Sequence, residues 1–341
     1  MPSTKPDDAT LRQLVAFHTV NISLGLVCSV LALILIFVFC TSTKMVRRNR
    51  LLFTLALADF CNCLAIALMG VDRVTLYEDL LEGGEATEKR AAECATEFWL
   101  LFRTIGDLWP PIVQTMIGLE QLLKVCSRHY NENRSRHFQI FTILFVVWAS
   151  SLGYATAYGR RNEKVKYFCG RKASFGKVFS VFIYFHNVFG YVAGLVMNVT
   201  AYAVASGHGH KTDAKIADEP DDRISPSAHR QMQVCIIVSS LSTMLVSLPN
   251  CLSVISAVNI AMSDYITKPA VYATCINSGI NIFVYFALNQ EFRRVCVYLL
   301  TREKPSPAPS SGQTAEDEVE EEWAEQSTAI TATQSHHKLM D

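Results

Sequence analysis

The sequence contains none of the short signatures that mark common hydrolases and nucleotide-binding enzymes. No HExxH, GxSxG or P-loop pattern occurs in its 341 residues, and the acids inside its apolar segments are not paired as an intramembrane protease requires. Basic and acidic residues are equal in number, so the net charge is zero and no nucleic-acid partner is indicated. The 11 cysteines form no CxxC pair. We therefore expect no enzyme, no organic cofactor and no metal other than the sodium ion considered below for Asp59.

Charged residues are also scarce, at 18% of the chain, and they collect between seven long apolar blocks. A block of about 20 apolar residues matches the roughly 30 Å hydrocarbon core of a bilayer. Backbone amides in lipid must bond within their own segment, so each block is predicted to be a helix. The blocks cover residues 17–40, 51–71, 98–123, 140–158, 178–205, 233–258 and 269–288. They predict an all-α membrane protein, a seven-transmembrane helix bundle.

The charges that flank the first block predict its orientation. The loop that follows it is basic, whereas residues 1–16 contain only Lys5 and Arg12 as basic residues. We therefore expect residues 1–16 to be an extracellular tail and the first loop to be cytoplasmic, in a multi-pass protein of the plasma membrane. The N-terminus lacks a basic stretch before a short apolar run, so no cleaved signal peptide is expected. The loop after the fourth block is basic too, which either attracts an acidic ligand or forms an ordinary solvated surface.

Two segments near the C-terminus differ from the seven blocks. Asn289 is a good N-cap for a short amphipathic helix that lies on the inner membrane surface after helix seven. Cys296 in this helix is either a palmitoylation site or an unmodified thiol. Residues 301–341 are rich in Pro, Ser, Thr and Glu and are expected to be a disordered cytoplasmic tail. The polar loop of residues 206–230 is expected to be flexible. Residues 17–300 then form the membrane domain.

One carboxylate lies near the middle of the second block. Asp59 is accompanied in the seventh block by Asn277, Ser278 and Asn281. A charge inside a membrane usually faces the bundle interior, so these side chains are predicted to form a buried polar cluster. The cluster either binds water or a sodium ion through oxygen ligands or contains a buried acid that serves packing alone.

The third block carries an ion pair of its own. Arg103 and Asp107 are four positions apart and therefore share a helix face. They either neutralise each other or line a ligand pocket in the outer half, which His186 and Asn187 of the fifth block would join. Prolines in the third and sixth blocks are predicted to kink those helices. These prolines are Pro110, Pro111 and Pro249.

Four stretches together resemble the rhodopsin-like G-protein-coupled receptors. They are "LALAD" ending at Asp59 with Asn49 ten residues before it, Trp148 in the fourth block, "NSGINIFVY" over residues 277–285, and Phe292 after Tyr285. The stretch "NSGINIFVY" is similar to the family's NSxxNPxxY motif. The stretch "GLEQLLKVCSRHY" resembles the nematode serpentine chemoreceptors of the Srsx class. The resemblance covers helices one to seven and the surface helix.

The chain also departs from the family pattern. The acid-arginine-aromatic signature at the end of helix three is Glu120, Gln121 and Leu122 here, and an amide cannot form the salt bridge of an arginine. Ile282 replaces the proline of NPxxY, and Ser247 stands where an aromatic residue usually precedes the helix-six proline. These departures leave open whether the usual G-protein switch operates.

The resemblance implies a ligand-operated receptor. A small molecule or peptide would bind from outside, helix six would tilt, and a heterotrimeric G protein would bind a cleft that includes Glu120, Gln121 and Tyr285. Asp59 and its helix-seven partners would act in the switch, and arrestin and a kinase would act on the tail. The resemblance also implies a disulfide between Cys94 and Cys169. The alternatives are a seven-helix receptor without G-protein coupling and, with less support, a transporter, for which no repeat is visible.

Overall fold

The structure is a computed structural model of the chain. It describes residues 7–85, 88–127, 130, 133–165, 169–212, 226–258 and 268–301. The chain divides into two compact units, Met1–Val295 and Cys296–Asp341. The first unit contains the helix bundle. Of the second unit, the described residues are 296–301, which end the last helix.

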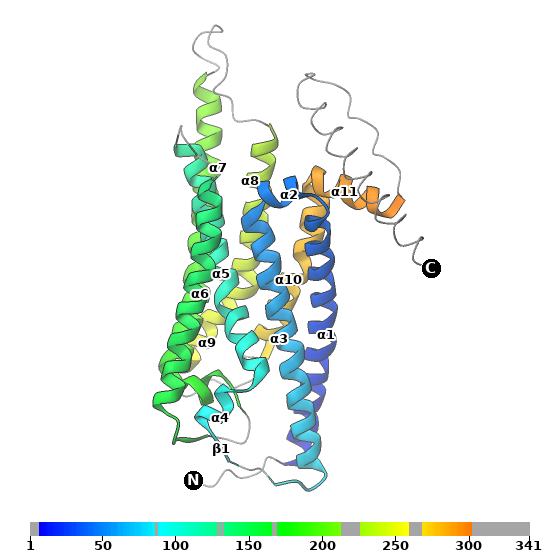
Figure 1. The fold of residues 1–341 in the computed structure, drawn as a ribbon, viewed down its shortest axis with the longest axis vertical. Coiled ribbons are helices and arrows are strands. Elements are labelled where there is room, and N and C mark those ends of the chain that lie inside the picture. Colours follow the sequence, from blue (N-terminus) through cyan, green and yellow to red (C-terminus); the bar gives the residue numbers. More distant parts are fainter. Residues whose placement is uncertain are drawn as a thin grey trace, which may run out of the picture. The chain divides into compact units, whose positions relative to one another are not determined.

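Long helices run alongside one another in the first unit (Figure 1). In chain order the elements are α1 (Asp8–Cys40), α2 (Thr43–Arg48), α3 (Arg50–Leu81), β1 (Lys89–Arg90), α4 (Ala91–Ala95), α5 (Phe98–Cys126), α6 (Asn133–Gly159), β2 (Lys164–Val165), α7 (Arg171–Thr212), α8 (Pro226–Ser242), the π-helical turn η1 (Thr243–Ser247), α9 (Leu248–Val258), α10 (Lys268–Leu288) and α11 (Gln290–Thr301). The antiparallel pair β1 and β2 and the helix α4 lie at one end of the bundle, and α2 lies at the other. The first is called the hairpin end below, although its two strands are not consecutive in the chain, and the second is called the α2 end.

Six of these helices are long and apolar enough to cross a membrane, as judged over the described residues. They correspond to the first, second, fourth, fifth, sixth and seventh predicted blocks, and the sixth block runs through α8, η1 and α9. The third block is α5, which is less apolar than that set and carries the charged residues Arg103, Asp107, Glu120 and Lys124. The first three of these side chains are buried inside the bundle. The seven-helix architecture predicted from the apolar blocks is therefore confirmed.

The surface of the bundle is apolar where a bilayer would cover it. Val27, Phe37, Phe185 and Phe283 are each about three-fifths exposed, although they are large hydrophobic residues. A water-soluble monomer rarely exposes so many, so this distribution indicates that lipid is the surrounding solvent.

The first helix begins at Asp8, earlier than the predicted start at residue 17. Leu11 is fully buried and packs in a small cluster with Tyr77 and Leu80, near the end of α3. This apolar contact extends both helices beyond the blocks that hydropathy outlines. The N-cap residue Asp7 accepts a hydrogen bond from the Thr10 hydroxyl, and this bond lowers the pKa of the Asp7 carboxyl below its ordinary value.

Two predicted loops contain more helix than expected. The first loop contains α2, capped by the Ser42 hydroxyl, which accepts a hydrogen bond from the Met45 amide. The segment of residues 206–230 was predicted to be flexible, but α7 continues to Thr212 and α8 begins at Pro226. Residues 213–225 and the predicted disordered tail from residue 302 lie outside the described residues.

Glycines allow α5 and α7 to approach closely. Gly190 and Gly194 form a GxxxG pattern on α7, and a Cβ atom added at either would lie within 2.9 Å of the main chain of α5, at Pro111 or Gln114. Gly118 of α5 faces Gly194 in return, at 2.6 Å from such a Cβ to the Gly194 carbonyl oxygen. Small residues at these positions let two membrane helices pack backbone to backbone. This contact fixes α7 beside the polar residues of α5.

The two kinks predicted in the third and sixth helices have different outcomes. The helix α5 continues from Phe98 to Cys126 with Pro110 and Pro111 inside it. Before Pro249 the helix changes to the π-helical turn η1, in which the Leu248 amide bonds the Thr243 carbonyl. Proline has no amide hydrogen, and a π-turn is a common way to accommodate the lost bond. The sixth helix is therefore irregular near Pro249.

Candidate functional site

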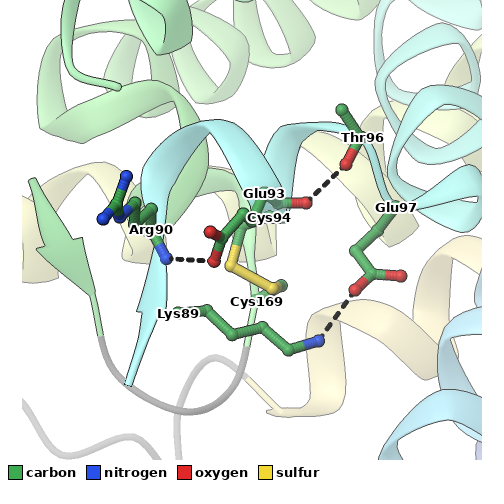
Figure 2. The surroundings of a disulfide bond; sticks show 7 residues. All are labelled: Lys89, Arg90, Glu93, Cys94, Thr96, Glu97 and Cys169. Carbon is green, nitrogen blue, oxygen red and sulfur yellow. Dashed lines mark hydrogen bonds and ion pairs between the residues drawn. A yellow bond between two sulfur atoms is a disulfide. The ribbon is translucent and has the colours of Figure 1, made fainter. Parts of the chain in front are cut away.

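A disulfide joins Cys94 to Cys169 at the hairpin end (Figure 2), as the resemblance implied. Cys94 lies in α4, just before α5, and Cys169 lies just before α7. Around the disulfide, Lys89 pairs with Glu97 at 2.8 Å, and the Arg90 amide donates to the Glu93 carboxylate at 2.9 Å. The disulfide thus ties the start of α7 to the start of α5.

Arg171, the first residue of α7, reaches the ion pair predicted on α5. Asp107 Oδ1 lies 3.3 Å from Arg103 Nη2, and Asp107 Oδ2 lies 2.5 Å from Arg171 Nη1. Arg103 Nη1 donates to Asn62 Oδ1 of α3 at 3.3 Å, and the Arg171 guanidinium stacks over the Tyr184 ring at 5.1 Å. One carboxylate thus serves two guanidinium groups. The sequence placed Arg171 only among the basic residues of a loop.

Two local features position Arg171. Cys169, two residues before Arg171, is held in place by the disulfide to Cys94. Gly176, five residues after it, has φ of +86°, so the first turn of α7 is set off from the rest of the helix. Only glycine adopts this conformation without strain. The backbone therefore directs the Arg171 turn over α5 and then follows α7 along the bundle.

His186 and Asn187, which were predicted to join the ligand pocket, hydrogen-bond to the main chain of α5. His186 Nε2 lies 3.0 Å from the Leu108 carbonyl oxygen, and Asn187 Nδ2 donates to the Asp107 carbonyl oxygen at 3.1 Å. The His186 ring also stacks on Phe145 and Phe182. Both side chains bind the α5 main chain and connect α5 to α7. The structure therefore brings Arg103 and Asp107 together with Arg171, while His186 and Asn187 support the backbone beneath them.

Asp59 bonds to α10 as the sequence suggested. Its Oδ1 accepts from the Ser278 hydroxyl at 2.9 Å, and its Oδ2 accepts from Asn281 Nδ2 at 2.7 Å. All three residues are at least 97% buried. The Oδ1 atoms of Asn277 and Asn281 are buried without a hydrogen-bond partner in the described part of the chain. A carboxylate, a hydroxyl and amide oxygens are the ligand types that hard cations prefer.

A second polar cluster lies in the bundle core and was not predicted. Asn198 Nδ2 of α7 donates to Ser239 Oγ of α8 at 2.7 Å, and Gln114 of α5 bonds the same hydroxyl. The Ser239 hydroxyl donates to the Cys235 carbonyl oxygen at 2.6 Å. These contacts join α5, α7 and α8. Gln114 and Asn198 are amides inside apolar blocks, a signal that was available in the sequence.

At the α2 end the predicted G-protein-facing residues are engaged. Glu120 pairs with Lys124 at 3.2 Å and accepts from the Tyr130 hydroxyl at 2.8 Å. Gln121 is 3% exposed, and its Nε2 lies 3.8 Å from Cys235 Sγ of α8. Within this end, α8 also contacts the α2–α3 junction through a bond from Gln231 Nε2 to Asn49 Oδ1 at 3.2 Å.

The last predicted site residues lie in α10 and α11. Tyr285 is buried against the rings of Phe39 and Phe292, and its hydroxyl has no partner among the described residues. Asn289 caps α11, as predicted, by accepting a hydrogen bond from the Phe292 amide at 3.0 Å. Cys296 is a free, partly buried thiol in this helix.

The chain matches a protein-family model. The family model described as serpentine type 7TM GPCR chemoreceptor Srsx matches residues 26–300, from within α1 to the end of α11. A search of curated proteins finds no match. The family consists of receptors and is not an enzyme class, and the match confirms the resemblance drawn from the helix motifs. The match covers well over half of the chain, so the protein belongs to the Srsx family of serpentine seven-transmembrane chemoreceptors.

Proposed function

We propose that the protein binds an extracellular small molecule or peptide near the hairpin end and activates a heterotrimeric G protein at the α2 end. One observation carries the proposal. The same helix, α5, bears the Arg103–Asp107 pair toward the hairpin end and Glu120 and Gln121 toward the α2 end. A ligand that changes how α5 packs at one end therefore acts on the residues that would face a G protein at the other.

The movement in this proposal is a shift of the sixth helix, α8 with η1 and α9. Polar contacts from Gln114, Asn198 and Gln121 attach it to α5 and α7. Ligand binding would favour a second packing in which these contacts are broken and a cleft opens beside Gln121 and Tyr285. A ligand shifts such an equilibrium only by its difference in affinity for the two packings.

The proposed orientation has its N-terminus outside and its C-terminus in the cytoplasm, in the plasma membrane. The disulfide at the hairpin end suits an oxidising exterior. The basic residues of α2 and its flanks suit a cytoplasmic face. The tail would serve a kinase and arrestin, and a palmitoyl chain on Cys296 would hold α11 at the bilayer surface.

Gln121→Arg is expected to raise second-messenger output in a reporter cell line. The proposal predicts that the G protein binds around residue 121. An arginine at this position restores the guanidinium group that the family has there, close to α8. We expect an increase of roughly fivefold or more in the response to an activating odorant or peptide. The measurement is a cAMP and calcium screen of the wild type and the variant with the same compound set.

Cys126→Arg is the matched control, because it adds an arginine at an exposed position of the same helix. It should leave the response unchanged. If neither the wild type nor Gln121→Arg responds to any compound, at equal surface expression, the second candidate is favoured instead. That candidate is a seven-helix receptor without G-protein coupling, and Gln121 in place of the family arginine is the observation that favours it.

A sodium ion beside Asp59 is a further part of the proposal. The carboxylate, the Ser278 hydroxyl and the orphaned amide oxygens of Asn277 and Asn281 fit such an ion. Bound there, it would stabilise the packing of α3 against α10 that the structure shows. It would also balance a negative charge that is otherwise costly in the membrane interior.

Asp59→Asn is expected to abolish stabilisation by sodium. For the purified wild type, replacing N-methylglucamine chloride by sodium chloride at equal ionic strength should raise the melting temperature by about 2–4 °C, which corresponds to about 1 kcal/mol. The variant should show no difference between the salts, because its amide cannot hold the cation. Asp79→Asn, an exposed acid of the same helix, should respond like the wild type. A sodium effect that survives in Asp59→Asn would exclude this site.

A further inference from the structure

The cluster at the hairpin end contains more positive than negative charge. Arg103 and Arg171 contribute two guanidinium groups, and Asp107 is the acid that pairs with them among the described residues. The other close groups, the Asn62 amide and the Tyr184 ring, are neutral. The cluster of Arg103, Asp107 and Arg171, called the arginine cluster below, therefore carries a net charge of +1.

This charge is withdrawn from solvent. The side chains of Arg103 and Asp107 are each 7% exposed, and that of Arg171 is 19% exposed. An uncompensated charge in such surroundings is strongly unfavourable, and it is normally paired with an opposite charge. The arrangement thus favours the arrival of one additional anion.

The geometry leaves donors for such an anion. Asp107 offers one oxygen to each guanidinium, so each arginine uses one terminal nitrogen for it, and the other terminal nitrogen of Arg103 donates to Asn62. A guanidinium has five N–H groups in a planar fork, and this fork matches the two oxygens of a carboxylate. Arg171 is the more exposed of the two arginines, so it is the group that an incoming anion reaches first.

Three other basic residues at the hairpin end have acidic partners. Lys89 pairs with Glu97, Lys164 pairs with Glu88, and the Arg160 guanidinium pairs with Glu163. Each of these pairs is neutral as a unit. Arg161 and Lys172 at this end are exposed to solvent, whereas the arginine cluster is largely buried, so the charge of the cluster is the costlier one to leave without an anion.

We infer that the arginine cluster recognises the carboxylate group of a small acidic ligand, with Arg171 and Arg103 donating to its two oxygens. This inference rests on the proposed function, because it assigns a chemical class to the ligand of that same site. The ligand carboxylate neutralises the cluster and loosens or replaces the contacts to Asp107. Because Arg103 and Asp107 belong to α5, a change in those contacts alters the packing of α5.

The test uses purified full-length protein and needs no G protein. Melting temperatures are measured with benzoate and hexanoate and with the matched amides, benzamide and hexanamide, at equal concentration and ionic strength. We expect the carboxylates to raise the melting temperature and the amides to have little effect. Equal shifts for each acid and its amide, or no shift with either acid, would overturn the inference.

Variants locate the effect. Arg171→Gln should weaken carboxylate binding by about tenfold to one-hundredfold, the usual value of a charge-assisted hydrogen bond. Arg171→Lys keeps the charge but loses the planar fork, so it should fall between Arg171→Gln and the wild type. Lys172→Gln removes an exposed charge one residue away and should bind like the wild type. Unchanged binding in both Arg171 variants would refute the assignment.

The two proposals fail in different ways. If carboxylates bind and depend on Arg171 but evoke no second messenger in cells, the ligand class stands and the signalling role falls. If cells respond to neutral or cationic compounds independently of Arg171, the receptor role stands and the carboxylate assignment falls.

Discussion

Replacing Cys94 or Cys169 by serine is expected to lower the free energy of unfolding by about 2–4 kcal/mol and to reduce the amount of receptor at the cell surface. The disulfide closes a segment of 75 residues by sequence separation, which contains α5 and α6. Without it, the unfolded chain gains freedom and the start of α7 loses its anchor to α4. Thermal unfolding of the purified variants, with surface labelling in cells, measures both effects.

The same substitutions should impair the arginine cluster more than stability alone explains. Arg171 follows Cys169 by two residues, so release of this anchor lets its guanidinium leave Asp107. Carboxylate binding should therefore be lost even at temperatures at which the variant is folded. Cys40→Ser is the control, because Cys40 is a free, exposed thiol, and it should match the wild type. A Cys169→Ser variant that retains the wild-type melting temperature would show that the disulfide does not stabilise this fold.

The helices of the bundle were predictable because a segment that is surrounded by lipid must be apolar along its whole length. Residues 51–71 and 140–158 each fall inside one observed helix. The helix ends were less predictable, because they depend on partners that a single segment does not reveal. Leu11, for example, lies in α1, where it packs on Tyr77 and Leu80. These partners are far away in the sequence, so the residues around Leu11 do not predict the contact.

The candidate site was predictable in part. The cluster of Asp59 with Ser278 and Asn281 follows from the rule that polar groups in a membrane seek one another. Arg171 was missed because it stands in a run of loop cations, and only the disulfide and the turn at Gly176 bring it to Asp107. Its role is a product of tertiary structure, whereas Arg103 and Asp107 share a helix face by spacing alone.

The helix α5 makes polar contacts with several other helices of the bundle. Asn62 of α3 bonds Arg103, Asn198 of α7 and Gln114 of α5 share the Ser239 hydroxyl, and Cys235 of α8 contacts Gln121. These contacts involve the buried side chains of Arg103, Gln114 and Gln121, which all belong to α5. A shift of α5 at the arginine cluster would therefore be transmitted to α8 by direct contact.

Gly194→Ala is expected to destabilise the receptor by about 1–3 kcal/mol or more, because the added methyl group has no room. Its Cβ atom would lie 2.7 Å from the Gln114 carbonyl oxygen and 2.9 Å from the Gln114 carbonyl carbon. These are main-chain atoms, so α5 and α7 must move apart to accept the methyl group. The separation would also disturb the bonds of Gln114 and Asn198 to Ser239. The measurement is the melting temperature of the purified variant.

Gly207→Ala provides a control on the same helix. A Cβ atom at residue 207 meets nothing within 4 Å, so the substitution should be neutral or raise the free energy of unfolding by up to about 1 kcal/mol through the better helix propensity of alanine. The difference between the two variants therefore isolates the close approach from helix propensity. If Gly194→Ala melts at the same temperature as Gly207→Ala, α5 and α7 do not pack backbone to backbone at this point. The route from the arginine cluster to α8 through Gln114 would then lose its structural basis.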